Sequence, residues 1–308
     1  MNRNMVGFAA RRIIPIPLLV FNPYHAKRVI VSGVLFSTTT GPLLFAHRGA
    51  STEWPENSLP ALARALDVGA DVLEIDVHMT LDGHPVVAHD PDGLRCAGVD
   101  RPIAACELSE LKTWDLWAGF AGQAVPERRA HPVRPSTLEE VLTSLPRAHF
   151  NVDVKQAEPD MVPSLIRLLK RHDACARVLL TSFSAAITAR IRRAGYPGPI
   201  GMARLDAAYT LLSPSAVVRR FPREARRLQI PSRYAGLHLA NRRTIERAHG
   251  LGLAVDYWVV NTPASATRLL DLGADGIVTD VPAVIAPVFR RHDRCDGYRV
   301  RHMQHDVT

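Results

Sequence analysis

From Leu43 onward, short runs of hydrophobic residues alternate with segments in which hydrophobic residues recur every three or four positions. The first pattern is typical of buried strands and the second of amphipathic helices. Their alternation predicts an α/β architecture in which helical crossovers join parallel strands. Nine runs are candidate strands: Leu43–Ala46, Val72–Val77, Val86–His89, Phe150–Lys155, Val178–Phe183, Pro199–Ala203, Gly236–Ala240, Leu253–Val260 and Gly276–Thr279.

One type of helix-to-strand joint occurs near both ends of this region. In the first copy Ser58 can cap a helix, hydrophobic residues over Leu59–Leu66 share one face, and Gly69 ends the helix before Ala70–Asp76. Leu270–Asp280 repeats this order. A closed barrel uses one such joint repeatedly, so the sequence predicts a TIM-type (β/α)8 barrel.

A barrel of this type has room for eight strands, so we expect Pro199–Ala203 or Gly236–Ala240 to be an accessory piece. We place the barrel at residues 43–289, with an N-terminal extension over 1–42 and a C-terminal tail over 290–308. The stretch from about 91 to 135 is long for a connection within a compact domain. We expect it to be an insertion over the barrel mouth, with Trp114, Trp117 and Phe120 as its own apolar cluster.

The extension is basic and partly apolar, with no acidic residue before Glu53. Its two apolar runs, Ile13–Phe21 and Val29–Phe36, are shorter than the roughly 20 residues that cross a bilayer. Pro15 and Pro17 interrupt the first run, which makes a secretory signal a poor fit. The alternatives are a segment packed on the barrel, a start codon assigned too early, or a peripheral membrane contact. We expect a cytoplasmic protein, with association with a membrane as the alternative.

Composition narrows the function classes. The 308 residues are 47% hydrophobic and 22% charged, typical of a globular domain. The formal charge of +8 comes from 34 Arg against 4 Lys, and no aromatic-interleaved basic stripe accompanies it, so we do not expect nucleic acid as a partner. Four cysteines, at 96, 106, 175 and 295, lack C-x-x-C spacing, which argues against a zinc knuckle or redox pair.

Polar side chains gather at the predicted strand ends. Glu74 and Asp76 share one face of a strand, and Asp153 and Lys155 share one face of another. Neighbouring carboxylates are costly unless a cation neutralises them, and oxygen ligands favour Mg²⁺, Ca²⁺ or Mn²⁺. With His47 and His89 at two further strand ends, the pattern predicts metal-assisted hydrolysis of a phosphate ester. The structural alternative is that the carboxylates pair with arginines and with Lys155.

An ordered set of short motifs now resembles the glycerophosphodiester phosphodiesterase family between about Leu43 and Phe289. The matching motifs are His47-Arg48-Gly49, Pro55-Glu56-Asn57-Ser58, Glu74-Ile75-Asp76-Val77, Thr80-Leu81-Asp82-Gly83, Val86-Val87-Ala88-His89-Asp90, Asn151-Val152-Asp153-Val154-Lys155, Thr181-Ser182-Phe183, Trp258-Val259-Val260-Asn261 and Gly276-Ile277-Val278-Thr279-Asp280.

The resemblance implies a TIM-type barrel with an insertion after the third strand, and hydrolysis of a glycerophosphodiester to glycerol 3-phosphate and an alcohol, within glycerol and lipid metabolism. It implies one divalent cation, Mg²⁺ or Ca²⁺ with Mn²⁺ as an alternative. By the resemblance, His47 and His89 are the acid and base, Glu74, Asp76 and Asp153 are the metal ligands, and Arg48, Lys155 and Trp258 contact the substrate.

Three positions depart from the family pattern. Asp153 stands where Glu is usual, which shortens the reach to a metal by one methylene group. Ser58 replaces a threonine, and both residues can cap a helix. Val259 replaces the threonine that usually follows the tryptophan.

Two other functions compete with the phosphodiesterase. A lysophospholipase D would use the same chemistry on a lysolipid, and the apolar N-terminal segment together with Trp114 and Trp117 is the feature that suggests it. A barrel that binds a phosphorylated ligand without hydrolysing it is the alternative from another class. The catalytic positions are all filled, which favours an enzyme.

Overall fold

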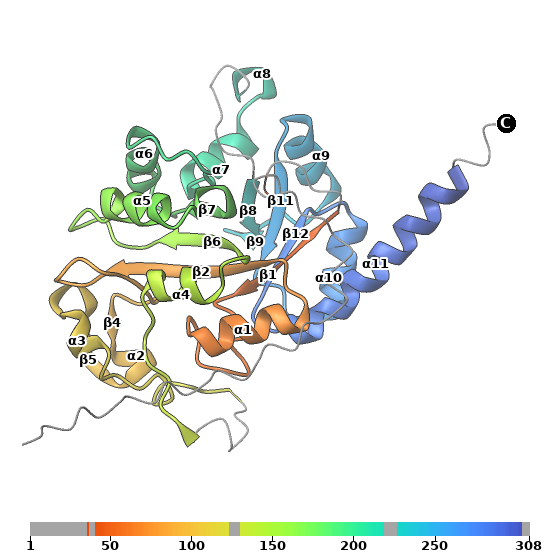
Figure 1. Ribbon diagram of the computed structural model, residues 1–308. Coiled ribbons are helices and arrows are strands. Elements are labelled where there is room, and N and C mark those ends of the chain that lie inside the picture. The colour runs from red at the N-terminus through yellow and green to blue at the C-terminus, as the bar shows by residue number, and fades with distance from the viewer. Residues whose placement is uncertain (1–35, 37–40, 123–129, 219–226, 304–308) are drawn as a thin grey trace, which may run out of the picture.

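Seven parallel strands form one curled sheet in the computed structural model, which describes residues 36, 41–122, 130–218 and 227–303 (Figure 1). The hydrogen-bonded order is β7-β6-β2-β1-β12-β11-β8. Most of these strands begin where a hydrophobic run follows a helix, as the pattern predicts. The strands are β1 (Leu43–His47), β2 (Val72–Met79), β6 (His149–Val154), β7 (Val178–Thr181), β8 (Arg227–Pro231), β11 (Ala254–Trp258) and β12 (Gly276–Thr279).

Beside β7, an isolated β-bridge takes the place of a full strand pairing. Leu180 pairs in parallel with Ile200, and the Leu180 amide donates to the Pro199 carbonyl at 3.0 Å. The run Pro199–Ala203 therefore takes the eighth position of the barrel. The other weak run, Gly236–Ala240, contributes only to a short hairpin of β9 (Arg233–Tyr234) and β10 (Leu237–His238). The fold is a TIM-type (β/α)8 barrel with one reduced strand.

Helices surround this sheet, and a long last helix projects from the barrel at the right of Figure 1. Helix α1 begins as predicted, because the Ser58 hydroxyl accepts from the Ala61 amide and Gly69 ends the helix in a left-handed conformation. The helices outside the insertion are α1 (Leu59–Val68), α4 (Leu138–Ser144), α5 (Val162–Arg171), α6 (Ala185–Arg193), α7 (Arg204–Leu212), α8 (Ser215–Val218), α9 (Arg242–Gly250), α10 (Pro263–Asp271) and α11 (Pro282–Met303), with a 3₁₀ turn at Cys175–Arg177.

The sequence analysis did not predict strand β8. This error has a physical cause. Its residues Arg227 and Gln229 both donate to Asp256 of the adjacent strand, the Arg227 Nε at 2.8 Å from Asp256 Oδ2. Both ends of this ion pair are fully buried. Because charged and polar residues of β8 point into the barrel, the strand lacks the hydrophobic run that we used to predict buried strands.

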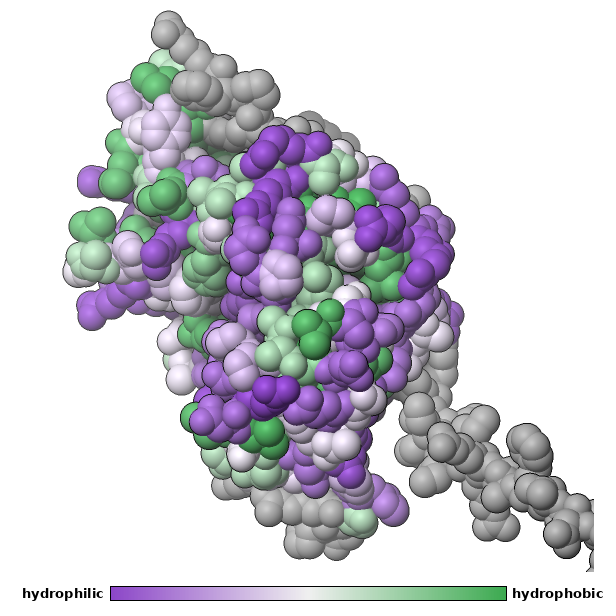
Figure 2. Space-filling view, turned by 90° about the vertical axis from the view of Figure 1, so that its left-hand side faces the viewer, coloured by the Kyte–Doolittle hydropathy of each residue, from purple (hydrophilic) through white to green (hydrophobic). Residues whose placement is uncertain are grey.

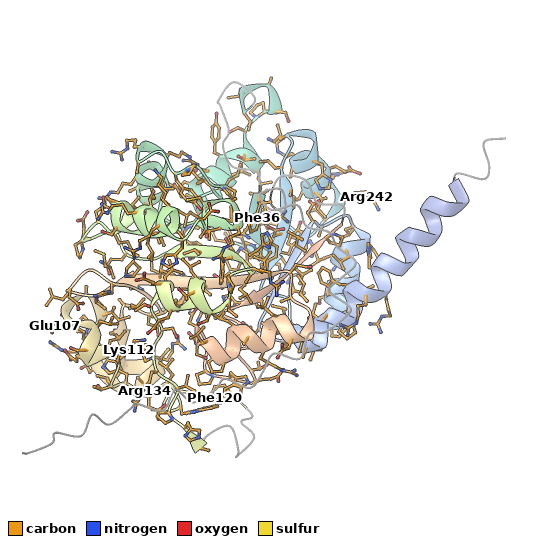
Figure 3. All side chains as sticks on the ribbon, in the orientation of Figure 1. Phe36, Glu107, Lys112, Phe120, Arg134 and Arg242 are labelled. Carbon is orange, nitrogen blue, oxygen red and sulfur yellow. The ribbon has the colours of Figure 1, made fainter. Side chains whose placement is uncertain are left out.

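Strand β3 (Pro85–Val87) runs antiparallel to β2, so the predicted strand Val86–His89 is not one of the parallel barrel strands, and the insertion follows it. The insertion has its own core, in which Trp114 and Trp117 are buried against Val86 and Trp54 packs on Trp117. Figure 3 shows Phe120 with Lys112 and Arg134 at the lower left, on this part of the chain. The predicted aromatic cluster is therefore present. The elements are β4 (Asp92–Gly93), α2 (Leu94–Ala97), β5 (Val99–Pro102), a 3₁₀ turn (Ile103–Ala105) and α3 (Leu108–Leu111).

Phe36 closes one end of the barrel interior. It is 4% exposed and packs with Leu43, Phe45 and Val72 (Figure 3). Its ring lies edge-on to His149, with 6.1 Å between the ring centroids. The other residues of the predicted extension before position 41 lie outside the described part of the chain. Within that described part, no helix combines the length and hydrophobicity needed to cross a membrane.

Candidate active site

Three buried carboxylates come from two adjacent strands. Glu74 and Asp76 lie on one face of β2, and Asp153 of β6 stands directly opposite Asp76 in the parallel register. Their residues are 7%, 1% and 4% exposed, respectively, so little water screens the three groups from one another. Asp76 is also fixed by Asn57, whose side-chain amide donates to Asp76 Oδ2 at 2.9 Å.

Arg48 reaches this cluster from a turn at the end of β1. Its φ of 57° and the φ of 84° at Gly49 turn the chain sharply, and a Cβ at Gly49 would lie 2.6 Å from the Ala61 carbonyl carbon. The Arg48 Nε lies 3.3 Å from Asp76 Oδ2, and its backbone amide donates to Glu74 Oε2 at 3.1 Å. Only glycine fits the last position of this His-Arg-Gly motif.

Lys155 bridges the two strands. Its Nζ lies 2.6 Å from Asp153 Oδ2 and 2.9 Å from Asp76 Oδ1. The ion pairs considered from the sequence as the structural alternative are thus present. Across the described residues, no group of three or more His, Cys, Asp or Glu side chains is arranged to hold a metal ion, and this includes the three carboxylates that we predicted as ligands.

The cations do not balance all of the negative charge. Burial and the neighbouring Asp76 raise the pKa of Glu74 to about 8, and burial raises the pKa of Asp153. Burial also acts on Asp76, but Lys155 and Arg48 outweigh it and lower the pKa of that carboxyl. The Oδ1 of Asp153 is buried without a hydrogen-bond partner. Hard oxygen donors with incomplete counter-charge have the chemistry that a divalent cation prefers, whereas in this arrangement it is Lys155 that lies against Asp76 and Asp153.

Both candidate histidines are oriented by carboxylates. The Nδ1 of His47 lies 2.6 Å from Asp280 Oδ1, and the Nδ1 of His89 lies 2.6 Å from Asp90 Oδ1. Because a carboxylate only accepts, each Nδ1 carries the proton and each Nε2 is left to act elsewhere. Burial lowers the pKa of His47, but Glu74 and the bond to Asp280 outweigh it, so the net pKa is raised.

Glu56 and Arg95 connect the insertion to this arrangement. Arg95 of α2 donates to Glu56 Oε1 at 2.6 Å and to Asp90 Oδ2 at 2.5 Å. Glu56 in turn accepts from the Arg48 Nη1 at 3.0 Å. One residue of the insertion therefore supports the partners of both Arg48 and His89.

All eight predicted site residues line one cavity of about 720 Å³. Trp258 lies on its wall with its ring centroid 5.7 Å from that of Phe183. Another part of the cavity lining is apolar and includes Met202, Leu211 and Ile230. The eight are His47, Arg48, Glu74, Asp76, His89, Asp153, Lys155 and Trp258.

Sequence reasoning missed the two aspartates that hold the histidines. Asp90 directly follows His89, and Asp280 ends the last motif of the barrel, where Asn261 also donates to it at 2.7 Å. The signal for Asp90 was its adjacency to His89. Asp280 is 233 residues from His47 in the chain, so only the closure of the barrel brings the two side chains together.

Comparison with known proteins gives a consistent result. Residues 47–284 match the model described as the glycerophosphoryl diester phosphodiesterase family. A probable glycerophosphodiester phosphodiesterase 2 of Mycobacterium tuberculosis is 29% identical, over 83% of this chain and 94% of the relative. Human lysophospholipase D GDPD1 is 26% identical, over 77% and 82%. A phosphodiesterase from Oleispira antarctica, solved with the product sn-glycerol-3-phosphate, superposes with a TM-score of 0.65 at 24% identity, covering 80% of this chain and 96% of that one.

Proposed function

We propose that this chain, which belongs to the glycerophosphoryl diester phosphodiesterase family, hydrolyses glycerophosphodiesters to glycerol 3-phosphate and an alcohol. The observation that carries the proposal is the pair of carboxylate-held histidines, His47 and His89, facing one cavity with Arg48 and Lys155. The product bound in the Oleispira phosphodiesterase, sn-glycerol-3-phosphate, is the one expected of this reaction. We propose a cytoplasmic location, as the sequence suggested.

In this reaction the histidines move protons at Nε2, because each Nδ1 is bound to a carboxylate. One imidazole takes the proton of the attacking oxygen, and the other protonates the leaving alkoxide. The attacking oxygen belongs to water or to the glycerol hydroxyl next to the phosphate. In the second case the alcohol leaves as a cyclic phosphate forms, and water then opens the ring to give glycerol 3-phosphate. Arg48 and Lys155 bind the phosphoryl oxygens and stabilise the charge that develops on them.

We assign the divalent cation, Mg²⁺ or Ca²⁺ with Mn²⁺ as an alternative, to Glu74, Asp76 and Asp153. The support is the unpartnered Asp153 Oδ1 and the raised pKa of Glu74, because both indicate negative charge without enough counter-charge. When bound, the ion would supply further positive charge beside the phosphoryl group.

Replacing His47 or His89 with Ala tests the assignment of the acid and base. We expect kcat for release of glycerol 3-phosphate from glycerophosphocholine to fall at least ~10²-fold in each variant. His84→Ala is the matched control, because this histidine is exposed and does not line the cavity. Turnover at the rate of the unaltered protein in both site variants would show that the histidines have another role.

Lysophospholipase D activity is a second candidate, favoured by the apolar side of the cavity. Met202, Leu211, Ile230 and Leu239 offer contacts for an acyl chain beside the charged residues. The aromatic residues that suggested this activity from the sequence are not involved, because Trp114 and Trp117 are buried in the insertion. Hydrolysis of glycerophosphocholine but not of lysophosphatidylcholine, assayed with each metal, would eliminate this candidate. Tight metal-dependent binding without hydrolysis would instead support a binding protein.

A further inference from the structure

Four large hydrophobic side chains stand exposed at the outer edge of the cavity. Leu205 and Leu212 of α7 are 70% and 74% exposed, and Tyr234 and Leu237 of the β9–β10 hairpin are 48% and 53% exposed. We call these four residues the apolar rim. In Figure 2 hydrophobic residues gather at the upper left, at the height that α7 and α8 have in Figure 1. Apolar side chains grouped in this way commonly mark an interaction site.

The apolar rim is continuous with the cavity. Each of its four residues lines the same cavity as His47 and Lys155. The apolar wall therefore runs from the charged floor of the site to the surface of the molecule. A partner that covers the rim would lie directly over the cavity entrance.

The charge beside the apolar rim is positive. Arg204 lines the same cavity as the rim, Arg233 belongs to the same β9–β10 hairpin as Tyr234, and both arginines are exposed. Neither has an ion pair with any residue that the structure describes. The acidic residue of α7, Asp206, lies 3.5 Å from Arg192, which compensates its charge. The rim thus presents leucines and a tyrosine next to cations that no described carboxylate neutralises.

We propose that the apolar rim docks the protein on an anionic lipid bilayer. The leucines enter the outer acyl region, Tyr234 lies at the headgroup level, and Arg204 and Arg233 contact lipid phosphates. The proposal goes beyond the proposed hydrolysis and does not require it. It also assigns the contact to the barrel mouth, whereas the sequence suggested the N-terminal segment.

The test is co-sedimentation of the full chain with vesicles of phosphatidylcholine and phosphatidylglycerol. We expect the double variant Leu212→Ser, Leu237→Ser to lower the partition coefficient about tenfold. Replacing Arg204 or Arg233 with Gln should lower it about fivefold each, and vesicles of phosphatidylcholine alone should remove this difference. Leu81→Ser is the matched control, because Leu81 is 65% exposed in the β2–β3 turn and does not line the cavity.

Vesicle binding that is unchanged in the double variant, or equally reduced by Leu81→Ser, would overturn the proposal. So would a dimer in sedimentation velocity that the double variant converts to a monomer without any effect on vesicle binding, because the rim would then join two copies of the chain. Melting curves of each variant establish that it is folded. Release of glycerol 3-phosphate from soluble glycerophosphocholine, measured on the unaltered protein, reports separately on the proposed function.

Discussion

At the residue scale, the geometry of the two cavity histidines depends on side chains that perform no chemistry themselves. Asp280 accepts from His47 and from Asn261, and Asn261 Oδ1 in turn accepts the Asp280 amide at 3.0 Å. This closed set of hydrogen bonds leaves the His47 ring one orientation and one tautomer. Asp90 holds His89 in the same way, with Arg95 behind it.

Asp280→Asn should therefore impair turnover more than substrate binding. The amide can donate to Nδ1, which favours the wrong tautomer of His47, so we expect kcat to fall about tenfold to a hundredfold with a smaller change in KM. Glu139→Gln is the control, because it alters an exposed partner of His172 and does not line the cavity. A change confined to KM would show that Asp280 acts on binding instead.

His149 should limit stability in acid. Burial, and secondarily Arg177, lower its pKa to about 4, whereas the unfolded side chain has a pKa of about 6.5. The unfolded state therefore binds more protons between these two values, so this contribution to the free energy of unfolding falls as the pH drops from about 6.5 to 4. The loss is about 2–3 kcal/mol by pH 4, and His149→Asn should remove it. Urea unfolding at several pH values measures the effect; parallel curves for the two proteins would contradict it.

At the element scale, the sequence located most strands because hydrophobic runs and helix ends coincide. It could not locate β8, whose polar residues Arg227 and Gln229 donate to the buried Asp256. Asp256 compensates them from another strand, 29 residues from Arg227 in the chain. Nor could it show that β3 runs antiparallel, since a short hydrophobic run has the same appearance in either direction. The run Ser136–Glu139 has the spacing of a capping box, but α4 forms its box one residue later, with Thr137 and Glu140.

Strand β12 depends on a glycine where it passes the buried ion pair. A Cβ at Gly276 would lie 2.2 Å from Asp256 Oδ1 and 2.8 Å from the Phe45 ring. We expect Gly276→Ala to lower the free energy of unfolding by about 2–3 kcal/mol. Gly250→Ala, at the end of α9, meets nothing within 4 Å and should change it by less than about 1 kcal/mol. Equal melting temperatures for the two variants would show that β12 can move away from Asp256 without loss of stability.

At the scale of the whole molecule, barrel closure brings together motifs that are far apart in the chain. The eight predicted site residues lie around one cavity because strand ends of a parallel barrel share one face. The sequence could predict this meeting from the order of the motifs. It could not predict the pairing of His47 with Asp280, which depends on side-chain rotation after closure.

Binding of the divalent cation should stabilise the entire fold. At about a hundred times Kd, an ion bound only by the native state contributes about 2.7 kcal/mol, which corresponds to a rise in Tm of about 5–10 °C. Glu74→Gln should reduce the rise at a given Mg²⁺, Ca²⁺ or Mn²⁺ concentration, while the exposed variant Glu107→Gln should retain it. Differential scanning calorimetry makes the comparison at constant ionic strength. A rise of the same size in both variants would remove Glu74 from the ligand set.

The position of Phe36 has a consequence for how far the chain can be shortened. Its ring packs against Leu43, Phe45 and Val72, although it precedes the first strand in the sequence. A polypeptide that started at that strand would lose the contacts that the Phe36 ring makes with these three side chains. We therefore expect the smallest stable unit to include Phe36, upstream of the family match, so that truncation at the first motif lowers the free energy of unfolding.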